Sequence, residues 1–231
     1  MLTIICKTAF VSYETIHSPD KLQDDPTTRV FTAMVDAYAH FDKALFGATL
    51  PKCVITWQRK SKSHGYFASH RFKARNSDTV VDEIALNPAY FSERTTKEIL
   101  STLVHEQAHV WQQHHGKPSR TGYHNVEWSE KMERLGLIPS STGRPGGKRT
   151  GQRVSHYIAI GGPFDRACDD LLSQGYNIEF ADRVTPTESP KRAGASRKKL
   201  AYSCKGCRAN TWGKPGLNIF CGDCQIAFVA A

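Results

Sequence analysis

The sequence predicts an α+β fold, in which helices pack on a small, mainly antiparallel sheet, followed by a small β module built around a metal. Two observations predict it. A long amphipathic helix at residues 96–116 follows one helical and three strand-like segments. Near the C-terminus, two Cys-x-x-Cys pairs are separated by thirteen residues. The 231 residues therefore divide into a domain at 1–184, a basic flexible linker at 185–199 and a cysteine module at 200–231.

The first predicted helix begins near Pro26, which suits a first helical turn, and ends at Gly47. Its apolar residues recur at helical spacing, so we expect it to pack under the sheet. Three segments rich in β-branched and aromatic residues follow between turn signals. They predict strands at residues 54–57, 65–72 and 79–86.

The helix at residues 96–116 carries His105, Glu106 and His109. Residues four apart lie one above the other on a helix, so both imidazoles can reach one metal ion. Neutral imidazole is a good zinc ligand. Glu106 stands beside the first histidine, where it can take a proton from a water molecule held at the site. The pattern indicates a zinc hydrolase, although these residue types also admit iron or manganese.

A catalytic zinc usually has three protein ligands, so a third must come from elsewhere in the chain. His115 stands six residues after the second histidine, but that arrangement needs a glycine where this chain has Gln112. His124 directly precedes a predicted helix at residues 125–135 that can pack beside the first one. We favour His124 over His115, with Glu127 as a less favoured alternative.

Residues 140–183 form an insert whose role the sequence does not define. It begins with a basic glycine-rich loop, which could cradle phosphates or rim a cleft. His156 is a fourth nearby histidine, and on an alternating strand it is more typical of a structural residue than of a ligand. The later predicted elements are a strand at 154–160, a helix at 163–174 and a strand at 176–180.

The four tail cysteines form two knuckles that can place four thiolates around one structural zinc. Glycine in each knuckle is expected to permit the tight turn. The module is too small to hold a core without metal, so zinc binding and folding should coincide. The odd number of cysteines argues for a reducing compartment rather than a disulfide framework. The predicted ligands are Cys204, Cys207, Cys221 and Cys224, and the other cysteines are Cys6, Cys53 and Cys168.

The net charge of +9 favours an acidic partner, most simply nucleic acid. Basic loops interleaved with aromatic residues can contact phosphates and stack on unpaired bases. The same loops could instead form a solvated hairpin with its aromatic side chains in the core. The candidate nucleic-acid contacts are Arg59, Lys60, Lys62, Arg71, Lys73, Arg75, Lys198, Lys199, Arg208 and Lys214.

No membrane association is expected. The chain contains no run of eighteen apolar residues, so no transmembrane helix is predicted. Residues 1–11 lack the basic start and small-residue cleavage site of a signal peptide, and we interpret them as a strand or an N-terminal arm.

The motif His105-Glu106-Gln107-Ala108-His109, followed by Gly122-Tyr123-His124 ahead of an amphipathic helix, resembles the SprT-like, or Spartan, family of zinc metalloproteases. The resemblance covers residues 30–137 and resumes in the cysteine-bearing tail. It implies a zincin-like domain with a C-terminal zinc ribbon, in which an edge strand binds the substrate backbone in extended form. By matching motifs it implies zinc ligands His105, His109 and His124, with Glu106 as the catalytic base.

DNA-dependent members of that family degrade proteins covalently trapped on DNA. The resemblance thus implies a DNA-associated zinc metalloendopeptidase of the DNA–protein crosslink repair type, with one catalytic and one structural zinc. Its expected partners are single-stranded or junction-containing DNA and the proteins trapped on it. We expect a monomer in the cytoplasm of a bacterial or phage-infected cell, or in the nucleus of a eukaryote. The alternative is a non-enzymatic zinc-ribbon DNA-binding or regulatory protein that keeps a zincin scaffold.

Overall fold

The computed structural model describes residues 25–183 and 199–230. The chain divides between residues 186 and 187 into two compact units, each of which is described here by itself. The expected N-terminal arm at residues 1–11 and nearly all of the expected linker lie outside the described residues. None of the described helices is long and apolar enough to cross a membrane.

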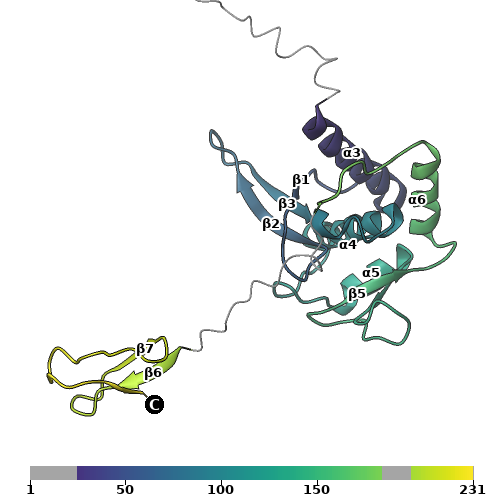
Figure 1. The fold of residues 1–231 in the computed structure, drawn as a ribbon. Helices are drawn as coiled ribbons and strands as arrows, with labels where there is room; N and C mark the ends of the chain where they lie inside the picture. The colour runs from purple at the N-terminus through teal and green to yellow at the C-terminus, as the bar shows by residue number, and fades with distance from the viewer. Residues whose placement is uncertain (1–24, 184–198, 231) are drawn as a thin grey trace, which may run out of the picture. The chain divides into compact units, whose positions relative to one another are not determined.

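The first unit contains all four α-helices of the described residues (Figure 1). Helix α3 (Pro26–Phe41) begins at Asp25, whose carboxylate accepts hydrogen bonds from two backbone N–H groups of the first turn. A π-helical turn, Asp42–Phe46, extends it to Gly47, which has a left-handed φ of 70°. The predicted helix from Pro26 to Gly47 is therefore confirmed.

A three-stranded sheet follows, made of β1 (Val54–Trp57), β2 (Gly65–Lys73) and β3 (Val80–Leu86). Among the described residues the strand order is β1-β3-β2, so β1 and β2 form the two edges of this sheet. Strand β1 runs parallel to β3 and β2 runs antiparallel to it. The three predicted strands are confirmed to within a residue, but this sheet is mixed rather than mainly antiparallel.

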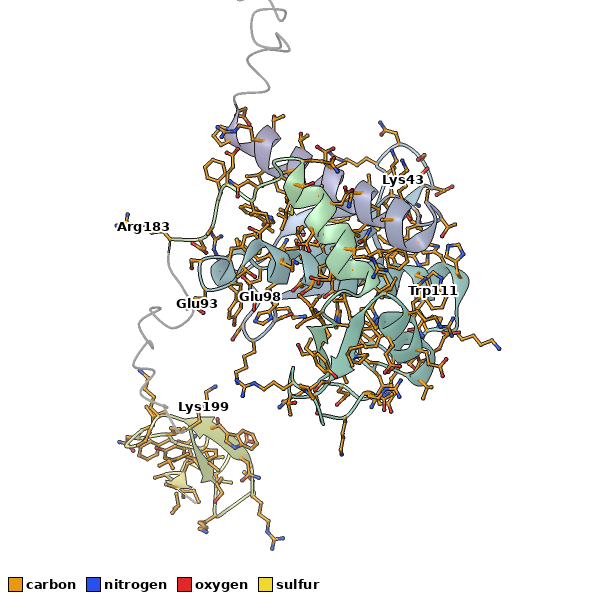
Figure 2. All side chains as sticks on the ribbon, turned by 90° about the vertical axis from the view of Figure 1, so that its right-hand side faces the viewer. Lys43, Glu93, Glu98, Trp111, Arg183 and Lys199 are labelled. Atoms are coloured by element: carbon orange, nitrogen blue, oxygen red, sulfur yellow. The ribbon has the colours of Figure 1, made fainter. Side chains whose placement is uncertain are left out.

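Helix α4 (Thr96–His115) lies against β2 and β3, and α3 packs beside it (Figure 1). Thr95 and Glu98 form a capping box at its start, in which each side chain binds the backbone N–H of the other. The apolar side of α4 is buried in the core, where side chains fill the space between the helices and the sheet (Figure 2). Helix α5 (Val126–Arg134) begins at Asn125 and packs on α4.

The insert and the few residues before it form the last part of the first unit. Strand β4 (Leu137–Ser140) pairs antiparallel with β5 (Ser155–Ile158), and α6 (Pro163–Ser173) packs on α3. The sequence did not predict β4, because Pro139 interrupts its strand pattern. The predicted strand at 176–180 is wrong: this segment pairs with no strand, and Tyr176 and Ile178 instead pack against the core.

The second unit is a small antiparallel sheet. Its strands are β6 (Leu200–Ser203), β7 (Asn210–Gly213) and β8 (Val229–Ala230), in the order β7-β6-β8. Tyr202 is buried, and its hydroxyl donates a hydrogen bond to the Lys214 carbonyl across the unit. We call this unit the ribbon.

Candidate metal centres

Three histidines converge in the first unit. His105 and His109 lie on α4, and His124 lies directly before α5. Their ligand nitrogens all lie within 4.8 Å of one another. The Nε2 atoms of His105 and His124 are 3.4 Å apart. Two nitrogens bound at about 2.0–2.1 Å to a tetrahedral zinc would be separated by about 3.4 Å, so this spacing fits zinc. We call these residues the histidine centre.

The insert holds His124 in place. The backbone groups of His124 and Gly151 exchange two hydrogen bonds of 2.8 and 3.0 Å, and His124 Nδ1 lies 3.0 Å from the Gly151 carbonyl oxygen. A carbonyl can only accept, so Nδ1 carries the proton in this contact. Nε2 of His124 is then left with a lone pair directed toward the other two histidines.

Trp128 of α5 forms a wall of the histidine centre. Its side chain is fully buried. The distance from its ring centroid is 4.3 Å to His124, 4.8 Å to His105 and 5.0 Å to His109. No pattern in the sequence indicated that Trp128 contacts all three imidazoles.

Glu106 lies beside the histidine centre and is only 4% exposed. Burial raises its pKa to about 8, whereas the charge of Lys60 and a hydrogen bond from the Phe67 N–H act in the opposite direction. Burial and the neighbouring His124 lower the pKa of His109 to about 3, so this imidazole is neutral and one of its ring nitrogens has a lone pair available.

A glycine brings β2 close to Glu106. A Cβ atom at Gly65 would lie 2.8 Å from the Ala85 oxygen, 2.9 Å from Thr102 Cγ2 and 3.3 Å from Glu106 Oε1. Only glycine leaves room for this approach of strand to helix. On the same strand, the Phe67 ring stacks on His109 with centroids 6.4 Å apart.

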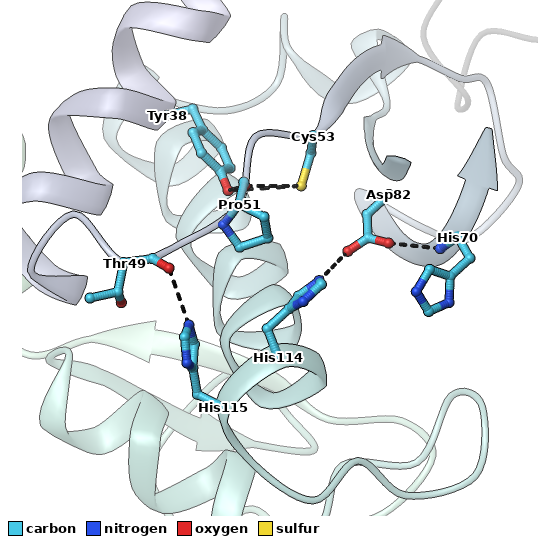
Figure 3. A network of polar contacts seen from close by, with 8 residues as sticks. All are labelled: Tyr38, Thr49, Pro51, Cys53, His70, Asp82, His114 and His115. Carbon is cyan, nitrogen blue, oxygen red and sulfur yellow. Dashed lines mark hydrogen bonds and ion pairs between the residues drawn. The ribbon is translucent and has the colours of Figure 1, made fainter. Parts of the chain in front are cut away.

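The alternative third ligands are engaged elsewhere. His115 Nε2 contacts the Thr49 carbonyl oxygen at 3.1 Å, in the segment after α3 (Figure 3). Its neighbour His114 contacts Asp82 of β3 at 2.7 Å (Figure 3). The Glu127 carboxylate accepts hydrogen bonds from the Lys117 N–H and from Gln112. The structure therefore brings His124, rather than His115 or Glu127, to the two helical histidines.

The four tail cysteines gather in the ribbon, with sulfur atoms within 4.8 Å of one another. The Sγ atoms of Cys207 and Cys221 are 3.6 Å apart. Thiolates bound at about 2.3 Å to a tetrahedral zinc would be about 3.8 Å apart, so the cluster also fits zinc. Hydrogen bonds from the backbone of Cys207 and then Gly206 lower the pKa of the Cys204 thiol, whereas hydrogen bonds with the other sulfur atoms raise the pKa of the Cys224 thiol.

The expected reason for the knuckle glycines is wrong. The left-handed residues next to the knuckles are Arg208, with φ 62°, and Gln225, with φ 55°, one directly after each knuckle. Neither Gly206 nor Gly222 has a positive φ. A Cβ at Gly206 would lie 2.8 Å from Cys224 Sγ, whereas a Cβ at Gly222 would meet nothing within 4 Å. Gly206 therefore provides space for a sulfur atom rather than a turn.

Where the structure describes them, some of the basic side chains predicted to contact nucleic acid form ion pairs with Asp or Glu, whereas others do not. Arg59 pairs with Asp182, Lys73 lies 2.7 Å from Asp78 and Arg71 lies 3.7 Å from Glu83. The Lys60 ammonium lies 4.7 Å from the centroid of the Tyr66 ring. Both aromatic residues in the 65–68 stretch are half-buried. Lys62, Arg75, Lys199, Arg208 and Lys214 are exposed, and Lys198 lies outside the described residues.

The histidine centre lies in the part of the chain that is similar to known proteins. The sequence model of the SprT-like family matches residues 34–145. An uncharacterized protein in the mucB 3′ region of Salmonella typhimurium is 41% identical over 59 residues, which are 26% of this chain and 80% of that protein. No solved structure matches the chain. The three histidines and Glu106 lie inside the matched range, whereas Gly151 and the ribbon lie beyond it.

Proposed function

Because this chain belongs to the SprT-like family, we propose that it is a zinc-dependent endopeptidase of zincin-like architecture that cleaves proteins attached to DNA. The family membership indicates a zinc-dependent, protease-like domain, and the proposal adds the DNA-linked substrate. The observation that carries it is the convergence of three imidazoles beside a buried carboxyl group. The proposal assigns one catalytic zinc to the histidine centre and one structural zinc to the ribbon.

In this proposal His105, His109 and His124 hold the catalytic zinc. A zinc ion there would polarise the peptide carbonyl and lower the pKa of a nearby water. Glu106 accepts a proton from that water as the water oxygen forms a bond to the carbonyl carbon. Glu106 then delivers the proton to the amine nitrogen as the C–N bond breaks. Burial raises the pKa of the Glu106 carboxyl above its ordinary value, which makes its carboxylate a stronger base toward that water.

Strand β2 is the proposed substrate strand. It is an edge of the sheet, and it carries Gly65 against Glu106 and Phe67 against His109. Strand β1 is the other edge, but β3 separates it from β2. An extended peptide that adds to the free side of β2 would therefore pass the histidine centre.

The proposed DNA contacts lie on both units. Lys60 and Lys62 are exposed in the loop before β2, and in the described part of the chain neither forms an ion pair. The ribbon exposes Trp212, at 65%, and Phe220, at 62%, together with the basic Lys214. Exposed aromatic rings next to cations suit stacking on unpaired bases and contact with phosphates, which favours single-stranded DNA as the ligand.

The test uses a protein covalently crosslinked to a single-stranded oligonucleotide, with and without a metal chelator, resolved on a gel. Wild type should release shortened protein, and Glu106→Gln should retain zinc but cleave about 10²–10⁴-fold more slowly. Glu130→Gln makes the same chemical change at an exposed position of α5 and should cleave like wild type.

Three results would contradict parts of the proposal. Undiminished cleavage by Glu106→Gln would remove Glu106 from the mechanism. Equal cleavage of the same protein without DNA would leave an endopeptidase with no DNA dependence. Salt-sensitive DNA binding without any proteolysis would instead support the non-enzymatic DNA-binding protein.

A further inference from the structure

A second imidazole stands behind His105. His156 comes from β5, beyond the residues that match the family, and its Nδ1 lies 3.1 Å from Nδ1 of His105. Its other nitrogen, Nε2, lies 2.9 Å from the Ser101 hydroxyl oxygen. That hydroxyl donates to the backbone carbonyl of Glu98 at 2.7 Å. A chain of three hydrogen bonds thus runs from the histidine centre to the first turn of α4, where Figure 2 labels Glu98.

The Glu98 end of this series of hydrogen bonds determines which atom donates in each bond. The Glu98 carbonyl can only accept, so the Ser101 hydroxyl proton is used there. The Ser101 oxygen must then accept from Nε2–H of His156. A neutral His156 protonated at Nε2 has a lone pair at Nδ1, so it accepts the Nδ1–H of His105. His105 is thereby left with its lone pair on Nε2, the atom that lies 3.4 Å from Nε2 of His124.

We propose that His156 is a positioning residue that holds His105 in the tautomer and ring orientation needed to bind the metal of the histidine centre. A metal-binding histidine commonly donates its second nitrogen to a neighbouring acceptor, which fixes the tautomer. Here the acceptor is another imidazole, held by Ser101. The inference rests on the proposed function only in taking His105 as a metal ligand.

The same reasoning gives the insert a role. Gly151 accepts from His124, and His156 accepts from His105, so residues 151–156 orient two of the three ligands. Both acceptors reach the site because β5 pairs with β4 directly after α5. We therefore infer that the insert completes the histidine centre by orienting its ligands rather than by supplying a ligand.

Two substitutions separate the hydrogen bond from the volume of the ring. His156→Phe keeps a ring of similar size but removes the acceptor. His156→Asn is smaller, yet its side-chain oxygen can stand where Nδ1 stands and accept from His105. The metal-free full-length chain is titrated with Co²⁺ in competition with a chelator. Absorption bands without thiolate charge transfer report the histidine centre, and thiolate charge-transfer bands report the ribbon.

His156→Phe should weaken Co²⁺ binding at the histidine centre by about 10–100-fold, and His156→Asn by much less. The ribbon affinity should be unchanged in both variants and serves as an internal reference. His115→Phe removes a comparable contact to the Thr49 carbonyl, away from the site, and should bind like wild type. Urea unfolding followed by circular dichroism confirms that each variant is folded.

Either of two results would overturn the inference. Equal affinity of wild type and His156→Phe would show that the contact does not position His105. Equal weakening in His156→Phe and His156→Asn would show that packing alone matters. The proposed function fails differently, because a wild-type chain that binds Co²⁺ at the histidine centre but cleaves no protein leaves the role of His156 intact.

Discussion

The indole of Trp128 stacks on the imidazole of His109, with ring centroids 5.0 Å apart and 17° between the planes. The same indole also contacts His105 and His124, so one buried side chain touches every proposed ligand of the histidine centre. A ring in that position packs against the imidazoles, and its fluorescence should respond to an ion that they bind.

The first prediction uses Trp128 as a reporter. Co²⁺ bound at the histidine centre should quench tryptophan fluorescence strongly, because the paramagnetic ion would lie next to this indole. Trp128→Phe should lose most of that quenching and lower the free energy of unfolding by about 1–3 kcal/mol, since a buried ring becomes smaller. Trp57→Phe, on β1, is the matched control and should keep the quenching. Full quenching in Trp128→Phe would place the bound ion elsewhere.

The second prediction concerns pH. Without metal, burial raises the pKa of Glu106 from its ordinary 4.5 to about 8, so the folded chain holds this proton more tightly than the unfolded chain. The stabilising contribution is fully present below pH 4.5 and is lost as the pH rises through 8. Glu106→Gln removes this dependence. The chelated variant should gain stability over chelated wild type as the pH rises, by at most about 1.4 kcal/mol per pH unit.

Urea unfolding of both chains, followed by the helical circular dichroism signal, measures that difference. All helices of the described residues lie in the first unit, so the ribbon contributes little to this signal. The contributions of the buried histidines cancel, because both chains contain them. A stability difference that stays constant across the pH range would show that the Glu106 carboxyl is not buried in solution.

How far the sequence predicts the histidine centre depends on the distance between its parts along the chain. His105 and His109 need only helical periodicity, because one turn of α4 places them together. His124 lies fifteen residues after His109 and required the rule of three ligands, together with the family resemblance. Local patterns therefore predict the two helical ligands and only suggest the third.

The groups that orient these ligands were not predictable from local patterns. Gly151 lies 27 residues after His124, and His156 lies 51 residues after His105. Both reach the site through the pairing of β5 with β4. The sequence did not predict β4, because Pro139 interrupts its strand pattern. The alternation of β5 indicated that His156 faces one side of a strand, but it could not identify what that side contacts.

The third prediction concerns the approach of β2 to α4. Gly65→Ala would place a methyl group 2.8 Å from the Ala85 oxygen and 2.9 Å from Thr102 Cγ2, so the strand must shift away from the helix. We expect a loss of about 1–3 kcal/mol in the free energy of unfolding. Peptide cleavage should fall by more than this loss explains, because the shift moves β2 away from Glu106. Wild-type kcat/KM in a destabilised Gly65→Ala chain would argue against β2 as the substrate strand.

The last prediction separates the two ribbon glycines. Gly206 is the third residue of its Cys-x-x-Cys knuckle and Gly222 is the second residue of the other, and only a Cβ at Gly206 would meet a proposed zinc ligand, at 2.8 Å from Cys224 Sγ. Cys224 cannot move away without leaving the position in which its sulfur lies with the other three, so Gly206→Ala should weaken zinc binding by the ribbon. Gly222→Ala meets nothing within 4 Å and should bind zinc like wild type.

Because metal binding and folding coincide in so small a unit, Gly206→Ala should also need more zinc for the ribbon to fold. Zinc titrations of the two full-length variants, followed by thiolate absorption, provide the comparison. Equal zinc affinities of the two variants would mean that the first knuckle tolerates a side chain beside Cys224. In that case the ribbon would need glycine at position 206 neither to make space for the sulfur atom nor to form a turn.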